Sequence, residues 1–411
     1  MPRCPSASRS RSPPSSPFWW RTSRSSSSRS RSSRGWTRSP CSPCPCSSLA
    51  GYLMDVGGIS GRLVALARAL VGHLPGGLGQ VVVMAEVFFS GVSGSTSADA
   101  AAVGGIMVPQ LTANGYSRAR ATAIVSAACG MGILIPPAIV MVVYGVIGNV
   151  SIGALFVASI VPALLIATGL MTQIGWQARR EGWPRGERAS FAELRRATLD
   201  AVLPLFMIVV ILGGIRFGLF TPTEAAAVAV AYALLLAGLV YRSLTLAELW
   251  SKVVQTAVVS GMVLFVVGAA HLLGWVLAVL QVPQTLASTV VGLGGGQLGF
   301  MLLTILVFLP LGAILEGVPA VVLLTPILLP LATQLGIDPV HFGAVIVATQ
   351  GISVFLPPVG VSLLVACSVG GVEPAEVARP LWPYLALMLA LTVAIALLPG
   401  VVLFLPELLG Y

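Results

Sequence analysis

Charged residues are scarce in this 411-residue chain and make up only 9% of it. A soluble domain carries about 25% charged residues, whereas a charge at the middle of a bilayer costs roughly 2.5–3.5 kcal/mol and is avoided there. Hydrophobic residues reach 56%, and the mean hydropathy is +0.94. The composition therefore excludes an ordinary soluble enzyme and predicts a chain that lies in a lipid bilayer.

The residues and motifs that most enzymes need are also missing. The sequence has only three histidines, no His-Glu-x-x-His zinc motif and no nucleophile elbow. It has no Gly-x-x-x-x-Gly-Lys-Ser/Thr loop, which excludes an ATP-driven motor within this chain. A polytopic membrane enzyme should cluster His, Asp and Glu and is disfavoured, so we expect neither catalysis nor a resident cofactor.

Basic residues are in excess only at the start of the chain. Residues 1–48 hold nine Arg and no acid, so removing them leaves 23 − 9 = 14 basic and 14 acidic residues, a net charge of zero. We therefore expect no nucleic-acid partner. Four of the six cysteines lie in the same segment, while Cys129 and Cys367 sit in apolar stretches, so neither a disulfide framework nor a zinc site is indicated.

Residues 1–48 admit three interpretations. Their Ser/Arg/Pro-rich composition is typical of a disordered basic tail, and the absence of an apolar core disfavours a secretory signal. The third interpretation is a frameshift just before Leu49. In the shifted frame, the last base of the Trp36 codon (TGG) and the first two bases of the Thr37 codon (AC) form GAC, which encodes Asp. The serine runs read as Leu, Phe and Val in the same frame. This hypothesis predicts that one or two apolar N-terminal helices are missing here.

From Gly51 onward, apolar stretches alternate with short polar breaks. A spanning helix needs roughly 20 apolar residues, and several stretches are shorter or interrupted by Gly and Pro, which predicts re-entrant hairpins and split helices. The charged connection 179–196 holds six Arg and is expected to be cytoplasmic. The expected stretches are 78–92, 119–147, 152–175, 199–219, 223–241, 252–281, 297–314, 318–335, 339–369 and 380–405.

The chain repeats itself at a spacing of 330 − 109 = 221 residues. Four prolines, at 109, 136, 137 and 162, recur at 330, 357, 358 and 383, and three glycines, at 91, 115 and 130, recur at 312, 336 and 351. The predicted chain crosses the membrane an odd number of times between equivalent positions of the two repeats. The two copies therefore have opposite orientations in the membrane, as in many secondary transporters. We predict an all-α polytopic membrane protein with inverted repeats, re-entrant hairpins and broken helices. Its expected parts are 1–48, a first repeat 49–175, linking scaffold helices 176–296 and a second repeat 297–411.

Each repeat carries two features that suit ion binding. One is a turn of small and polar residues, at 90–99 (SGVSGSTSAD) and 311–319 (LGAILEGVP); the other is a proline pair, at the end of 130–137 (GMGILIPP) and of 351–358 (GISVFLPP). A proline pair frees carbonyls of the preceding turn, which at membrane depth need another helix, an ion or water. Sodium accepts such oxygens and hydroxyls. A helix that begins near Ser97 would direct its positive end at an anion.

A plainer interpretation is that the prolines are only kinks and that the Ser/Gly run only packs helices. Duplication of both features favours a site. Acids at membrane depth are further candidates: Asp99, which is equally suited to capping a helix, and Glu316, followed by Glu86 and Glu224 if these do not lie near an interface.

These stretches resemble the large permease subunit of tripartite ATP-independent periplasmic (TRAP) transporters. The resemblance extends over nearly all of 49–411, and the shifted reading of the preceding residues is similar to the family's N-terminal region. The stretches that carry it are 89–104, 135–137 with 144–145, 150–156, 221–226, 316–330, 336–343 and 357–360.

The resemblance implies an elevator-type ion transporter fold in the bacterial inner membrane. It implies sodium-coupled uptake of a small organic anion (dicarboxylate, keto acid or sugar acid), with a small four-helix membrane subunit and a periplasmic substrate-binding protein as partners. It also places the substrate and sodium sites at the hairpin tips and broken helices. The matching positions are Ser93, Gly94, Ser95, Thr96, Ser97, Gly130, Pro136, Pro137, Gly312, Glu316, Gly317, Gly351, Pro357 and Pro358.

The chain departs from the family pattern at two places. Residues 127–129 are Ala-Ala-Cys where the family often has Ser or Thr, and Leu356 stands where it often has Thr, so carbonyls would replace a hydroxyl ligand there. Two other functions stay open. One is a stand-alone ion-coupled carboxylate transporter that needs no binding protein, and the other is an inactive, truncated relic of the TRAP subunit.

Overall fold

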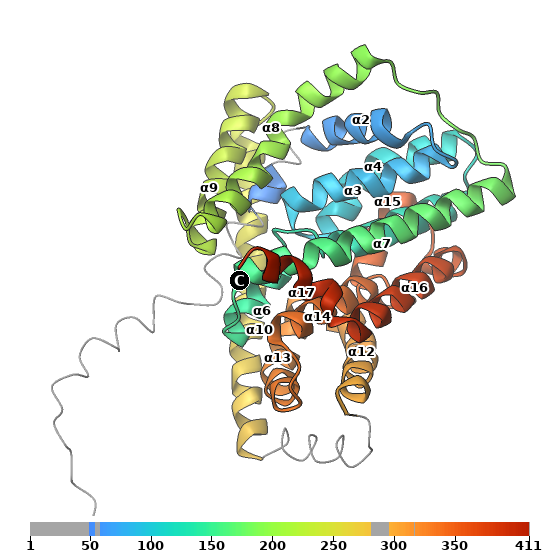
Figure 1. The fold of residues 1–411 in the computed structure, drawn as a ribbon. Coiled ribbons are helices and arrows are strands. Elements are labelled where there is room, and N and C mark those ends of the chain that lie inside the picture. Colours follow the sequence, from blue (N-terminus) through green and yellow to red (C-terminus); the bar gives the residue numbers. More distant parts are fainter. Residues whose placement is uncertain (1–48, 54–57, 281–295, 316, 411) are drawn as a thin grey trace, which may run out of the picture. The chain divides into compact units, whose positions relative to one another are not determined.

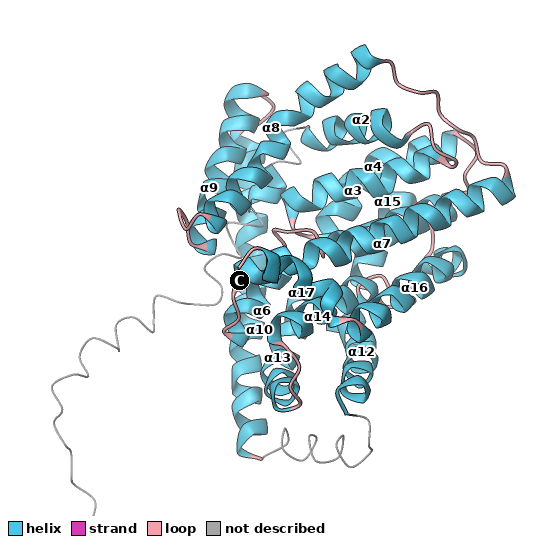
Figure 2. Ribbon diagram, viewed as in Figure 1, coloured by secondary structure: helices cyan, strands magenta, loops and turns pink. Residues whose placement is uncertain are grey.

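The structure, a computed structural model, describes residues 49–53, 58–280, 296–315 and 317–410. Residues 1–48 and the predicted site residue Glu316 lie outside these ranges. In the described part of the chain every regular element is a helix (Figure 2). Their order along the chain can be followed in Figure 1. The first half comprises α2 (Ile59–Val71), α3 (Gly77–Ser93), α4 (Thr96–Ala113), α5 (Arg118–Gly132), α6 (Ile139–Gly148), α7 (Ile152–Glu181), α8 (Phe191–Arg216) and α9 (Pro222–Leu234).

The second half begins with a π-helical turn, η1 (Leu235–Val240), that continues α9. It is followed by α10 (Leu246–Val279), α12 (Gly296–Leu315), α13 (Gly317–Gln334), α14 (Pro339–Ser353), α15 (Val361–Gly370), α16 (Pro374–Leu397) and α17 (Pro399–Leu408). Of these and the earlier helices, five are long and apolar enough to cross a membrane: α7, α8, α12, α13 and α16. The prediction of an all-α, multi-pass membrane protein is confirmed.

Local sequence explains where several helices begin. The hydroxyl of Ser190 accepts a hydrogen bond from the backbone N–H of Glu193, whose carboxylate in turn accepts from the N–H of Ser190, which starts α8. Thr221 and Glu224 form the same reciprocal pair at α9. Glu224 is exposed and caps a helix. Glu224 is therefore not a buried acid, a possibility that the sequence had left open.

The repeat predicted from the sequence is present in the helices themselves. Adding 221 to the bounds of α4 (96–113) gives 317–334, the bounds of α13, and adding it to those of α5 (118–132) gives 339–353, the bounds of α14. After α5 and α14 the helix stops, at 133–138 and 354–360, before it resumes as α6 and α15. Both proline pairs lie in these breaks, and both Pro–Pro bonds are cis. The predicted apolar stretches 119–147 and 339–369 are thus the two broken helices.

The two repeats exchange partners. The second arm of the first hairpin, α4, packs against α15 of the other repeat, and α13 of the second hairpin packs against α6. The first halves of the broken helices, α5 and α14, pack against each other. A two-fold relation between the repeats produces this exchange, because each element then meets the counterpart of its own neighbour.

Equivalent glycines meet where the broken helices cross. A methyl group added at Gly351 would lie 2.1 Å from the carbonyl oxygen of Gly130, and one added at Gly130 would lie 2.6 Å from the carbonyl oxygen of Gly351. Since these positions are 351 − 130 = 221 residues apart, each is the other's counterpart. The approximate two-fold axis therefore passes between them.

Two details differ from the sequence expectations, and a third feature was not predicted. The charged connection is shorter than predicted, because Arg179 and Arg180 belong to the last turn of α7 and Arg195 and Arg196 lie on α8. The stretch 380–405 divides into α16 and α17 at Pro399, which cannot continue a helix from the preceding turn. A third feature is the internal position of Tyr384, which is buried and donates its hydroxyl to the Gln177 side chain.

We predict that Gly351→Ala strongly destabilises the folded chain. The added methyl group would overlap the Gly130 backbone, which cannot move aside as a flexible side chain does, so we expect a loss of about 1–3 kcal/mol or more. Thermal unfolding of the purified protein in detergent measures it. Gly105→Ala is the matched control, because the exposed helical Gly105 has open space at its Cβ and the change should be neutral or stabilising. Equal unfolding temperatures for the two variants would contradict the crossing.

Candidate functional site

The tip of the first hairpin rests on the first helix break. The helix α3 ends at Ser93, Gly94 turns the chain with a left-handed φ of 64°, and α4 begins at Thr96 after the extended Ser95. A methyl group at Gly94 would lie 2.8 Å from the carbonyl oxygen of Pro137. Only glycine suits this position, because it allows both the backbone conformation and the close approach.

The first proline pair frees a carbonyl, and the hairpin occupies it. In an uninterrupted helix the Gly132 carbonyl would accept from residue 136, but Pro136 has no N–H. Instead it accepts from the Ser90 hydroxyl at 2.6 Å and from the N–H of Ile135 at 2.8 Å. The freed oxygen predicted from the sequence is therefore present, and a hydroxyl of α3 holds the hairpin onto α5 through it.

At the second break, the freed carbonyls accept hydrogen bonds from backbone N–H groups of the break and of α15. The Ser353 carbonyl accepts from the N–H of Leu356 at 3.0 Å, and the Val354 carbonyl accepts from the N–H of Leu363 at 3.3 Å. Beside this turn, Gly312 of α12 lies against Gln350 and Ser353, with the Gln350 amide donating to the Gly312 carbonyl at 3.4 Å. The second hairpin thus packs on its own repeat's broken helix, as the first does.

Two carboxyl groups are fully buried between the first hairpin and α5. Asp99 lies in the first turn of α4 and accepts a hydrogen bond from the Ser93 hydroxyl across the tip. A methyl group added at Gly132 would lie 3.6 Å from Oδ2 of Asp99. Glu86 lies on α3 and accepts from the Cys129 thiol at 2.8 Å. Both side chains are buried, so both stay the candidate acids that the sequence named.

Helix N-termini of the two repeats meet in two unlike pairs. The first residues of α4 and α15 are joined by a hydrogen bond of 3.1 Å between the hydroxyls of Thr96 and Ser362. The first residues of α13 and α6 meet through apolar groups, with Gly317 near Val140 and an apolar cluster beside them. The buried members of that cluster are Ile139, Val143 and Val322. Among the described residues, one pair therefore offers hydroxyls and the other apolar surface.

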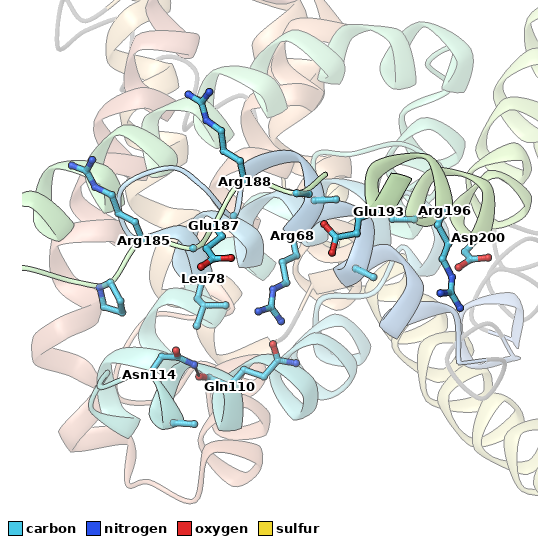
Figure 3. A pocket seen from close by; sticks show the side chains of 18 residues that line it. Arg68, Leu78, Gln110, Asn114, Arg185, Glu187, Arg188, Glu193, Arg196 and Asp200 are labelled. Atoms are coloured by element: carbon cyan, nitrogen blue, oxygen red, sulfur yellow. Dashed lines mark hydrogen bonds between the residues drawn. The ribbon is translucent and has the colours of Figure 1, made fainter. Parts of the chain in front are cut away.

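A cavity of about 760 Å³ lies elsewhere, between α2, the end of α4, the connection 184–189 and the start of α8. Its lining includes Arg68, Arg185, Arg188 and Arg196 together with three acidic residues. Figure 3 shows Arg185 and Arg188 pointing away from Arg68 and Arg196. These charges do not converge on one point of the cavity.

The structure gathers the predicted site residues at two places. Around the first hairpin tip lie 93–97 with the break that contains Pro136 and Pro137, and Gly130 supports them at the helix crossing. Gly312, Gly317 and Gly351 lie around the second hairpin and its broken helix, with Pro357 and Pro358 in the break. Their roles as ligands stay a prediction. Sequence reasoning did not identify Ser362 and Gln350, and it included Ser90 only as the start of the polar turn 90–99. A hydroxyl four residues after the second proline pair was the available signal for Ser362.

Comparison with known proteins decides the family. Residues 39–401 match the family model described as "Tripartite ATP-independent periplasmic transporter, DctM component". The chain belongs to the DctM family of TRAP transporters. The large permease protein DctM of Pseudomonas aeruginosa, named as a C4-dicarboxylate TRAP transporter component, is 39% identical over 88% of this chain and 85% of its own length. The sialic acid TRAP transporter large permease SiaM of Vibrio cholerae is 38% identical over 88% and 85%.

Solved structures confirm the fold. The YdaH transporter of Alcanivorax borkumensis, described as having an unusual topology, matches 87% of this chain and 85% of its own with a TM-score of 0.57 at 15% identity. The sequence-based resemblance to the TRAP large permease is confirmed. DctM-family proteins are transporter components, so this chain is not an enzyme, and it is a multi-pass protein of the inner membrane.

We predict that Ser90→Ala loosens the hairpin from the broken helix. The variant removes the hydroxyl that binds the freed Gly132 carbonyl, which keeps the Ile135 N–H as its other donor, so the loss is about 0.5–1.5 kcal/mol. Thermal unfolding checks the loss, with Ser251→Ala on the exposed face of α10 as control. A stability equal to that of the control variant would show that the hydrogen bond contributes nothing.

Proposed function

We propose that this chain carries out sodium-coupled uptake of a small organic anion across the inner membrane. The observation that supports it best is the meeting of the α4 and α15 N-termini at the Thr96–Ser362 hydroxyl pair. A helix N-terminus carries about half a positive charge and unpaired N–H donors. Two such ends, with hydroxyl donors and no fixed positive charge, suit a carboxylate that must also be released.

Sodium is proposed to bind close to this anion site. Its ligands would be hydroxyls and carbonyls of 93–97 and of the two breaks, as the resemblance to the family implies for these positions. The ion then compensates the charge of the anion as both enter the membrane. Neutral oxygen ligands avoid the cost of a fixed charge when the site is empty.

Hairpins and broken helices are proposed to move together as an elevator-type transport unit. Support comes from their dense mutual packing through α3–α5 and α12–α14, while α8 to α10 connect the repeats. The partners would be a small membrane subunit and a periplasmic binding protein, in accord with the tripartite family name. The relatives named for C4-dicarboxylates and sialic acid both act on acids, which agrees with an anion as substrate.

Reconstitution tests the proposal. We expect the chain, placed in proteoliposomes with its two partners, to accumulate a labelled dicarboxylate, keto acid or sugar acid only when sodium is higher outside. Uptake that is equal with potassium would overturn the sodium coupling. Uptake without any binding protein would favour a stand-alone carboxylate transporter, and a folded chain that moves no anion would indicate an inactive relic.

We predict that Thr96→Val and Ser362→Ala raise the KM for the transported anion about tenfold, each removing one hydroxyl at the paired N-termini. The initial rate of uptake against anion concentration measures this. Thr112→Val, near the other end of α4 where the hydroxyl bonds only local carbonyls, is the control and should transport normally. An unchanged KM in both site variants would move the anion site away from these helix ends.

A further inference from the structure

Glu86 occupies a position that an ionised carboxylate tolerates badly. It lies in α3, its side chain is completely buried, and it faces α5 inside the membrane-embedded body. Placing an isolated charge in such surroundings is costly unless the charge is paired or fully hydrogen-bonded. The contacts of its two oxygens therefore indicate whether the carboxyl group is ionised or protonated.

The carboxyl group receives one weak donor. The Cys129 thiol donates to Oε1 at 2.8 Å, and a thiol is a weak hydrogen-bond donor. The other oxygen, Oε2, is buried and has no hydrogen-bond partner within the described residues. An ionised carboxylate is stabilised in a protein interior by two or three donors. Glu86 has only one weak donor among the described residues.

Among the described residues, no positive charge is found to compensate Glu86 either. The helices that pack against α3 are α2, α4, α5, α7 and α8. The described groups that act on Glu86 are the Asp99 carboxyl of α4, through its charge, and the Cys129 thiol of α5, through its hydrogen bond. On α2, Arg62 lies over the ring of Tyr241. A negative charge on the nearby Asp99 makes an ionised Glu86 costlier still.

We propose that Glu86 is a proton-binding site, and that it holds its proton while α3 and α5 are packed together. A metal ion fits less well, because Oε1 already accepts from the thiol and the neighbouring Gly132 carbonyl already accepts two hydrogen bonds. A proton needs no further ligands: it makes the carboxyl neutral and turns Oε2 into a possible donor. The proton leaves to water only when the hairpin separates from α5, which links pH to the closure of hairpin on broken helix. Glu86 itself is not among the residues proposed to bind the anion or sodium.

Infrared spectroscopy of the full chain tests the proposal directly. A protonated carboxyl has a C=O stretch that a carboxylate lacks. We expect this band in the wild type at neutral pH, its loss in Glu86→Gln, and a shift in Cys129→Ala, which removes the hydrogen bond to the group. Glu376→Gln, an exposed glutamate in α16, is the control and should leave the band unchanged. A wild type without the band, or a band that Glu86→Gln and Cys129→Ala leave untouched, would overturn the proposal.

The pH dependence of unfolding gives a second readout. An unfolded Glu releases its proton near about pH 4.3, whereas the folded chain retains it, so folding takes up a proton and stability falls as pH rises above that value. The wild-type unfolding temperature should therefore decline more steeply between about pH 5 and 8 than that of Glu86→Gln, whose side chain is neutral throughout. Equal slopes would count against the proton. If Glu86→Gln does not fold, the wild-type band and its shift in Cys129→Ala still decide the question.

Discussion

The fold depends on one close contact between two backbones. At the crossing of α5 and α14 no side chain separates the helices, because Gly130 and Gly351 face each other and a methyl group on either would overlap the carbonyl of the other. This approach brings both helix breaks to the same depth. The hairpin tips, which rest on the breaks, are placed by it in turn. A crossing between larger residues would hold the helices further apart and would open both hairpin contacts.

The exchange of partners between the repeats then creates the candidate site. Each hairpin's second arm starts beside the resumed helix of the other repeat, so helix N-termini meet in pairs. Symmetry alone would make the pairs alike. The side chains make them different, since Thr96 and Ser362 correspond to Gly317 and Met141 at a spacing of 221 residues. A carboxylate is favoured where hydroxyls accompany the helix ends, and an apolar part of a substrate would suit the other pair.

Much of this arrangement could be predicted from the sequence, because its signals are local. Proline pairs interrupt helices wherever they occur, and the 221-residue spacing gave the correspondence between repeats, which the bounds of α4 and α13 reproduce. The packing partners could not be predicted. Nothing in the order of residues says that Ser90 reaches the Gly132 carbonyl or that Thr96 meets Ser362 across 266 positions. Likewise nothing in the order of residues says that Tyr384 is buried with its hydroxyl donating to Gln177 on α7.

The two repeats have diverged most in the charge they bury. Glu86, Asp99 and Cys129 of the first repeat correspond to Val307, Ala320 and Gln350 of the second. Where the first hairpin meets its broken helix through two acids and a thiol, the second does so through a neutral amide beside Gly312. A neutral amide has the same polarity at every pH, whereas a buried acid must exchange a proton when its surroundings open. Among the described residues, the first hairpin interface thus carries titratable groups and the second a neutral amide, so the proposed proton site belongs to the first repeat.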